Sequence, residues 1–146
     1  MPLASKKYFL DSSTLIHAVD KTAQFHNECL NILIKCSKAE INAATSLETL
    51  EETLYILSKL TNSSTALGII TDLLKMSKIT KYEMDLSIFE QALEIIETTP
   101  LKSPKDAINV ATMLENKIEF IVSEDKDYDR VNLIQRIHPK EIIAST

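Results

Sequence analysis

The segment spanning residues 101–130 constrains the fold most, because it contains a helix start, a β-prone strand and a run of acids in that order. Ser103 followed by Pro104 is typical of a helix N-terminus, and Asp106 lies where an acid completes such a cap. The β-prone residues 119–123 come next. Four acids then follow directly: Glu124, Asp125, Asp127 and Asp129. Because sites in open α/β sheets lie beyond the carboxyl ends of strands, these acids are candidates for chemistry.

Strand-like and helical segments alternate along the rest of the chain. Strands are expected at residues 8–10, 40–44, 77–84, 119–123 and 133–137. Helical spacing of apolar residues is found at residues 15–19, 22–38, 47–57, 64–76, 86–98 and 104–114. Thr45 and Glu48 are expected to cap the third of these helices. The pattern predicts one domain, residues 1–146, folded as a three-layer α/β/α sandwich around a mostly parallel sheet of about five strands.

Composition excludes several classes of protein. Gly68 is the single glycine, so glycine-rich phosphate loops cannot be built. Cys29 and Cys36 lie seven residues apart on one expected helix, about 10 Å along its axis, and are expected to be reduced. The sequence has neither an apolar run long enough to span a bilayer nor a signal-peptide core, which favours a cytoplasmic protein without a membrane contact. The net charge of −5 does not indicate nucleic-acid binding, although bound cations would change the local field.

The acids have structural as well as functional interpretations. Asp11 ends the first strand and can cap the next helix, but neighbouring serines can do the same, which favours a site role. For Asp106, the pattern alone favours a capping role. Glu51 and Glu52 share a helix that is apolar over most of its circumference, so it is expected to be buried on more than one side. One of the two glutamates then needs a partner or a metal. The acid nearest the late strand is Asp125.

The remaining acids and the histidines are not assigned a role in the chemistry. Asp129 is expected at the surface, and the role of Asp127 is left open. The histidines, His17, His26 and His138, lie far apart in the sequence without ligand spacing, so they are expected to be structural or exposed and a zinc site is not indicated.

Four motifs taken together resemble the PIN-domain family of metal-dependent nucleases: YFLDSSTLI, TSLETLEETLYIL, SPKDAINVATMLE and FIVSEDKDY. The resemblance covers nearly the whole chain. It implies that four acids form the catalytic, metal-binding set: Asp11, Glu52, Asp106 and Asp125. The family's spacing from a serine to the glutamate and on to a tyrosine favours Glu52 over Glu51. Ser13 and Ser123 take positions that support the acids.

The resemblance also implies a function. Hard carboxylate ligands select Mg²⁺ or Mn²⁺, and the family fold implies endonucleolytic hydrolysis of RNA leaving a 5′-phosphate. At this size the chain resembles the toxins of the VapC type within the family, which are often paired with an antitoxin and often homodimeric. It is equally compatible with a free-standing PIN ribonuclease of RNA processing or turnover. The alternative is a catalytically silent PIN-fold scaffold or RNA-binding module. A haloacid-dehalogenase-like phosphatase is disfavoured, since Ser13 stands where that motif needs a second aspartate.

Overall fold

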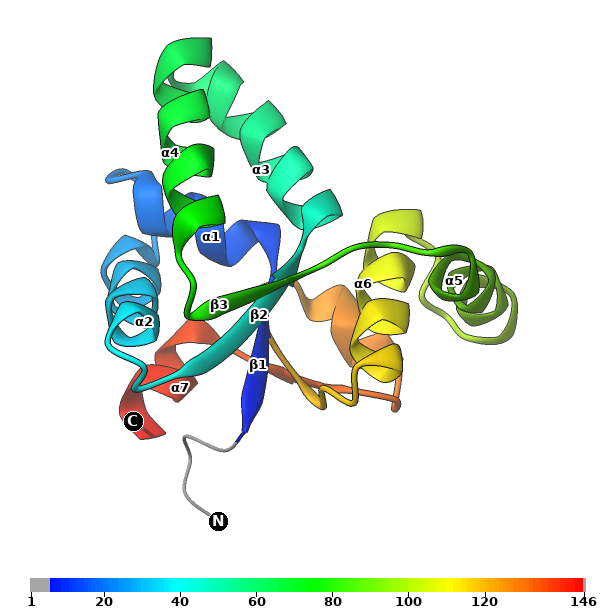
Figure 1. Ribbon diagram of the computed structural model, residues 1–146. Helices are drawn as coiled ribbons and strands as arrows, with labels where there is room; N and C mark the ends of the chain where they lie inside the picture. The colour runs from blue at the N-terminus through cyan, green and yellow to red at the C-terminus, as the bar shows by residue number, and fades with distance from the viewer. Residues whose placement is uncertain (1–5, 146) are drawn as a thin grey trace.

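The computed structural model describes residues 6–145, so the predicted domain bounds at residues 1 and 146 lie outside it. Within these residues, five strands form one all-parallel sheet in the order β3-β2-β1-β4-β5 (Figure 1). The strands are β1 (Lys7–Leu10), β2 (Asn42–Ser46), β3 (Ile79–Tyr82), β4 (Phe120–Val122) and β5 (Gln135–Ile137). The expected α/β fold with a central parallel sheet is confirmed.

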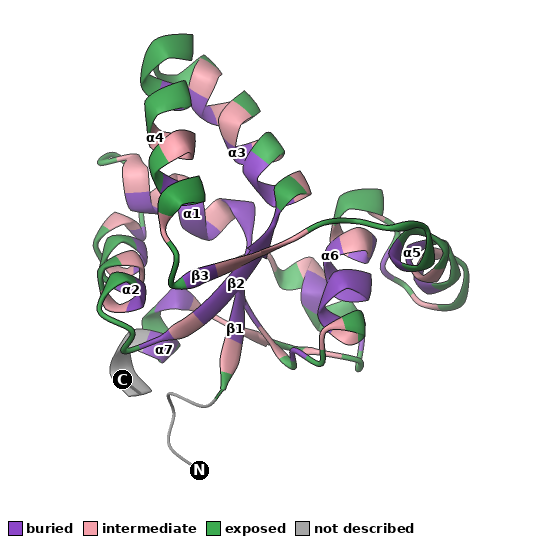
Figure 2. Ribbon diagram, in the orientation of Figure 1, coloured by how far each residue is buried: buried purple, intermediate pink, exposed green. Residues whose placement is uncertain are grey.

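Seven α-helices and one 3-10 helix are described between residues 6 and 145. They are α1 (Ser12–Val19), α2 (His26–Ser37), α3 (Leu47–Leu60), α4 (Ser63–Lys75), α5 (Leu86–Thr98), α6 (Pro104–Glu115), η2 (Lys126–Arg130) and α7 (Pro139–Ser145). Helices α1, α2 and α7 lie on one side of the sheet, and α5 and α6 lie on the other (Figure 1). The α3–α4 pair projects away from the sheet, and its outer turns are exposed (Figure 2).

The order of the strands places a crevice beside β1. The chain first adds β2 and β3 on one side of β1, and then returns to add β4 and β5 on the other. Such a reversal opens a crevice outside the carboxyl ends of the strands, here between β1 and β4. The backbone N–H of Asp11 donates to the Val122 carbonyl at 3.3 Å, so the ends of these two strands lie side by side.

The strands are apolar because both faces of the sheet are covered. Phe9, Ala44 and Ile121 point to one face and pack with α5 and α6 in the first core cluster. Their neighbours Leu10 and Val122 point to the opposite face, where α1, α2, α3, α4 and α7 supply the second cluster. This alternation follows from the two-residue period of a strand. The same alternation determines to which face of the sheet the side chain that follows each strand points.

Two expectations about α3 are wrong. Thr45 does not cap this helix, because it lies in β2 and its hydroxyl donates to the Leu10 carbonyl at 2.9 Å. Ser46 is the cap, and it accepts from the Thr49 N–H at 3.1 Å. The helix also buries one face only, because it projects from the sheet, so Leu47 is exposed despite its place in the apolar stripe.

Among the other local predictions, the start of α6 is confirmed and the start of α2 is shifted. Ser103 caps α6 with Pro104 in its first turn, as expected. The second helix starts at His26 rather than at residue 22, because Thr22 forms a turn in which Asp20 accepts from its N–H at 3.0 Å. Both cysteines are free and buried. Among residues 6–145, no helix is both long enough and apolar enough to cross a membrane.

Candidate functional site

The carboxyl ends of β1 and β4 open into a cavity of about 600 Å³. Its lining is acidic and hydroxylated, with two lysines at the rim: Asp11, Ser12, Ser13, Glu52, Ser103, Lys105, Asp106, Glu124, Asp125, Lys126 and Asp127. All four acids predicted from the sequence are in this set. The cavity therefore brings together predicted acids that lie up to 114 residues apart in the chain, Asp11 and Asp125. Their role in catalysis and metal binding stays a prediction.

Asp11 combines the two roles that the sequence left open. It is the N-cap of α1 and accepts from the Ser12 N–H at 2.9 Å. Its other carboxylate oxygen accepts from the Ser123 hydroxyl at 2.8 Å and from the Ser13 hydroxyl at 3.5 Å. The residue is only 6% exposed. The two serines predicted to support the acids thus contact Asp11 directly.

Asp106 begins α6, where its N–H donates to the Ser103 cap at 3.4 Å. Its carboxylate accepts from the Tyr128 hydroxyl at 3.0 Å. The first turn of the helix therefore fixes the backbone, while the side chain reaches the acids that follow β4. Both interpretations of this residue, as a helix opener and as a member of the acid set, agree with the geometry.

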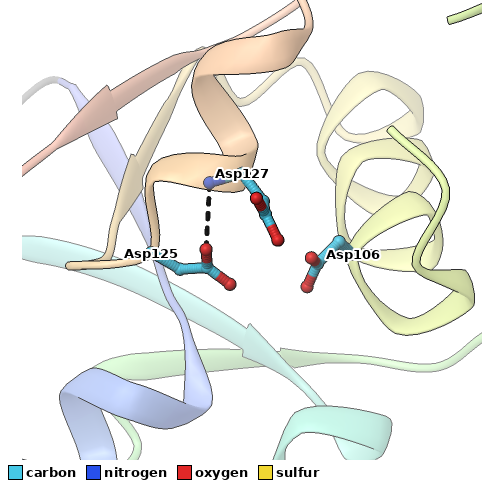
Figure 3. Close-up of side chains that lie close together, drawn as sticks. All are labelled: Asp106, Asp125 and Asp127. Carbon is cyan, nitrogen blue, oxygen red and sulfur yellow. Dashed lines mark hydrogen bonds between the residues drawn. The ribbon is translucent and has the colours of Figure 1, made fainter. Parts of the chain in front are cut away.

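Asp125 and Asp127 come from η2. Asp125 caps that 3-10 helix and accepts from the Asp127 N–H at 2.9 Å. Figure 3 shows both carboxylates pointing toward Asp106, and the three residues each offer an oxygen within 4.8 Å of the others. Asp127 was not among the predicted site residues. Its alternation with Asp125 was the available signal, but a 3-10 turn rather than a strand brings both to the same side.

Glu52 and Glu51 lie in different surroundings. Glu52 lines the acid cavity and forms an ion pair with Lys105 at 3.3 Å. Glu51 is exposed and lines only the neighbouring cavity of about 380 Å³ between α3 and α6, where Glu48 also lies. Glu52 lines both cavities and Glu51 only the second; the choice of Glu52 as the helix acid stays a prediction.

Burial and mutual repulsion raise the pKa values of two carboxyls. Burial raises the pKa of Asp11 to about 6, against the hydrogen bonds from Ser123 and Ser12, and the charges of Glu52 and Asp125 add to the rise. Burial also raises the pKa of Asp106 to about 6, with further contributions from neighbouring acids and an opposing hydrogen bond from Tyr128. The charged cavity is therefore costly in the absence of a cation.

Two further polar residues of the site, Asn109 and Tyr128, were not predicted from the sequence. Tyr128 is fully buried and Asn109 is 4% exposed, and both touch Asp11. Asn109 lies among the apolar side chains of α6, and a lone amide in such a stripe is a signal that a buried partner exists. The hydroxyl of Tyr128 could not be placed from the sequence, because its partners Asp11 and Asp106 are distant in the chain.

Several ionisable side chains around the cavity contact a neighbouring side chain. His17 lies 3.2 Å from Glu124, and its ring stacks on Phe25. His138 packs against the edge of the Phe25 ring. His17 and His138, which are far apart in the sequence, therefore both contact Phe25. Asp129 is exposed, as expected, and accepts from the Arg136 guanidinium at 3.0 Å. These contacts are consistent with structural roles.

The donor set fits a hard divalent cation. Asp106, Asp125 and Asp127 supply carboxylate oxygens only, the ligand type that Mg²⁺ and Mn²⁺ prefer. These three aspartates are the residues that would hold such an ion, and each offers an oxygen within 4.8 Å of the others.

Comparisons with known proteins point to one family. A model of the PIN domain matches residues 8–133. A comparison with curated proteins returns no match. The fold is similar to VapC20 of Mycobacterium tuberculosis, a sarcin-ricin loop cleaving toxin, with a TM-score of 0.71, 18% identity, and coverage of 84% of this chain and 92% of that one.

Two complexes solved with DNA show the same fold. VapBC from Salmonella typhimurium matches with a TM-score of 0.69, 17% identity, and coverage of 92% and 98% of the two chains. VapBC2 from Rickettsia felis, bound to a DNA fragment from its promoter, matches with a TM-score of 0.68, 15% identity, and coverage of 90% and 98%. At these identities the likeness establishes the fold alone.

Proposed function

Since the chain belongs to the PIN-domain family, we propose that it is a metal-dependent endoribonuclease that hydrolyses RNA phosphodiester bonds at the acid cavity. The observation that carries this proposal is the convergence of three aspartates from α6 and η2 in one cavity with Asp11 and Glu52. Burying acids beside one another is unfavourable by itself, and it raises the pKa values of Asp11 and Asp106. A cation site accounts for their retention in one place.

The proposed ion is Mg²⁺ or Mn²⁺, held by Asp106, Asp125 and Asp127 with Asp11 and Glu52 beside them. When bound, such an ion activates a water and neutralises charge on the phosphodiester. The protein's own contribution is to hold the carboxylates in place. Ser123 and Ser13 orient Asp11, and the Asp127 N–H orients Asp125.

Lysines at the cavity rim can receive the RNA backbone. Lys105 and Lys126 both line the cavity. The side chain of Lys105 is 67% exposed although it pairs with Glu52, so it can turn from the carboxylate toward a phosphate at small cost. Phosphate contacts of this kind position a strand without reading its sequence.

The proposal extends to a toxin–antitoxin pair acting in the cytoplasm. Support comes from the folds that match, which include a toxin and complexes of toxins with antitoxins. Large apolar side chains are exposed on the packed pair α3 and α4 and, separately, on α5. They are Leu47, Tyr55, Leu60, Leu67 and Leu74 on the pair, and Leu86, Phe89 and Leu93 on α5. Exposed apolar surface of this extent marks interaction sites, and an antitoxin and a second copy of the chain are its proposed occupants.

The test is cleavage of labelled RNA by the purified protein. Structured and unstructured RNAs are incubated with Mn²⁺, Mg²⁺ or EDTA, beside Asp106→Asn. The matched control is Asp72→Asn, because Asp72 is exposed on α4 and outside the cavity. We expect metal-dependent cleavage by the wild type and by the control, and loss of cleavage in Asp106→Asn. Equal traces for all three folded proteins on a broad RNA pool, without Mn²⁺ binding, would favour the scaffold alternative.

A further inference from the structure

A buried hydrogen-bond network lies beneath the acid cavity and links three elements of the fold. Its members are Ser46 and Thr49 at the start of α3, Asn109 in the middle of α6, and Tyr128 in η2. We propose that Asn109 and Tyr128 are positioning residues, which hold Asp11 and Asp106 at the relative placement that a bound divalent cation requires. This inference rests on the proposed function, because it assigns a task within the same site.

Tyr128 joins two carboxylates through one atom. Its hydroxyl oxygen lies 3.0 Å from Oδ1 of Asp106 and 3.4 Å from Oδ1 of Asp11. Asp11 follows β1 and Asp106 lies in the first turn of α6, so the hydroxyl bridges the acids that these two elements bring to the cavity. The second oxygen of Asp106 is not needed for this contact and remains available to a ligand.

The direction of each hydrogen bond in the network is determined. The Ser46 hydroxyl donates to the Thr49 hydroxyl at 2.9 Å, and Thr49 donates to Oδ1 of Asn109 at 3.3 Å. The Asn109 amide must then present its NH₂ group to Tyr128, at 2.9 Å, and to Asp11, at 3.4 Å. Because Tyr128 accepts from Asn109, its own proton is free to point to Asp106 or Asp11.

The direction of these hydrogen bonds matters because the site consists of acids, which accept hydrogen bonds when ionised. The network reaches the carboxylates through donors, the Asn109 amide and the Tyr128 hydroxyl. Asp11 and Asp106 are therefore held as acceptors on their inner side. The side chain of Asp106 faces Asp125 and Asp127 (Figure 3), and Asp11 lines the same cavity. Partners of this second layer set ligand orientation in metal sites, and their removal typically lowers metal affinity about 10–100-fold.

The burial of the network makes the positioning precise. Thr49, Asn109 and Tyr128 are each 4% exposed or less, so water cannot easily replace a lost hydrogen bond. The Tyr128 ring packs in the core cluster beside α6. A Tyr128→Phe substitution retains that ring and removes only the hydroxyl, which separates positioning from packing.

The experiment measures Mn²⁺ binding by electron paramagnetic resonance on the full chain. The variants are Tyr128→Phe and the matched control Tyr55→Phe, in which the altered tyrosine is 59% exposed on α3. We expect Tyr128→Phe to weaken Mn²⁺ binding about 10-fold and to leave the circular dichroism spectrum unchanged. Tyr55→Phe should bind Mn²⁺ as the wild type does.

Two outcomes would overturn the inference, and they can be told apart. Equal Mn²⁺ affinity for the wild type and a folded Tyr128→Phe would overturn the positioning role alone. No binding by the wild type would overturn the proposed function and this inference with it. If Tyr128→Phe does not fold, Thr49→Val provides the same test, because it removes the hydroxyl that orients the Asn109 amide. It should weaken Mn²⁺ binding by a smaller factor, and unchanged affinity would again refute the role.

Discussion

Replacing Asp106 with asparagine should change the stability of the protein in opposite directions with and without metal. In EDTA at pH 8 the carboxylate is charged, although burial and the neighbouring acids raise its pKa to about 6. The raised pKa means that these unfavourable effects outweigh the favourable position at a helix N-terminus. Asp106→Asn removes the charge and keeps an oxygen for the Tyr128 hydroxyl. We therefore expect the metal-free variant to be more stable than the wild type.

The size of the effect follows from the pKa. A rise from 3.8 to about 6 corresponds to about 3 kcal/mol for a fully buried group. Because the Asp106 side chain is only half-buried, solvent screening reduces this value, and we expect about 1 kcal/mol. For a chain of 146 residues that difference raises the melting temperature by about 3–5 °C.

Added Mn²⁺ should reverse the order of stability. A ligand at 100 times its dissociation constant stabilises the folded state by about 2.7 kcal/mol, and the wild type should gain this while the variant gains little. The assay is a thermal melt at pH 8 in EDTA and in Mn²⁺, with Asp72→Asn as the control. A variant less stable than the wild type in both buffers would refute the reasoning, because Asp106 would then act only through its helix.

Three further predictions concern the acids and the thiols. Glu52→Gln should lower the rate of RNA cleavage by at least about 10-fold, whereas Glu51→Gln should leave it near that of the wild type; the reverse result in a paired assay would exchange their roles. Burial raises the pKa of Asp11 to about 6, so its contribution to metal-free stability is fully present below about pH 4 and is lost as the pH rises through 6. Mn²⁺ must compete with protons over the same range, and its shift of the melting temperature should be larger at pH 7.5 than at pH 5, which melts at both pH values would check. Burial raises the pKa values of Cys29 and Cys36 to about 12, so a thiol reagent at pH 8 should react quickly only after denaturation, and fast labelling of the native protein would contradict their placement in the core.

The fold could be predicted because its signals are local. Strands buried on both faces appear as short apolar runs, and the helices between them carry apolar residues at helical spacing. The Ser103-Pro104 start of α6 is also local and was predicted correctly. Thr45 was assigned to a cap wrongly, because both serine and threonine occur as caps and only the pairing of β2 with β3, where Thr45 lies opposite Lys81, places Thr45 in the sheet.

The site could be predicted only in part, because several of its contacts join residues that are distant in the chain. Asp11 and Asp125 follow strands, so their position at the edge of the sheet is implied by the pattern. The contribution of Asp127 depends on a 3-10 turn that the sequence did not reveal. The roles of Asn109 and Tyr128 depend on contacts 19 to 117 residues apart in the chain. Such contacts arise only once the sheet has brought β1, α6 and η2 together.

The central claim is that the acid cavity cleaves RNA through a bound divalent cation. Its most direct test measures bound Mn²⁺ and the rate of RNA cleavage together, over one titration from metal-free protein to saturation. We expect that cleavage is absent in EDTA, rises in proportion to occupancy of the site, and yields products with a 5′-phosphate. Cleavage that persists in EDTA, or a fully occupied site that leaves a broad pool of RNAs intact, would contradict it.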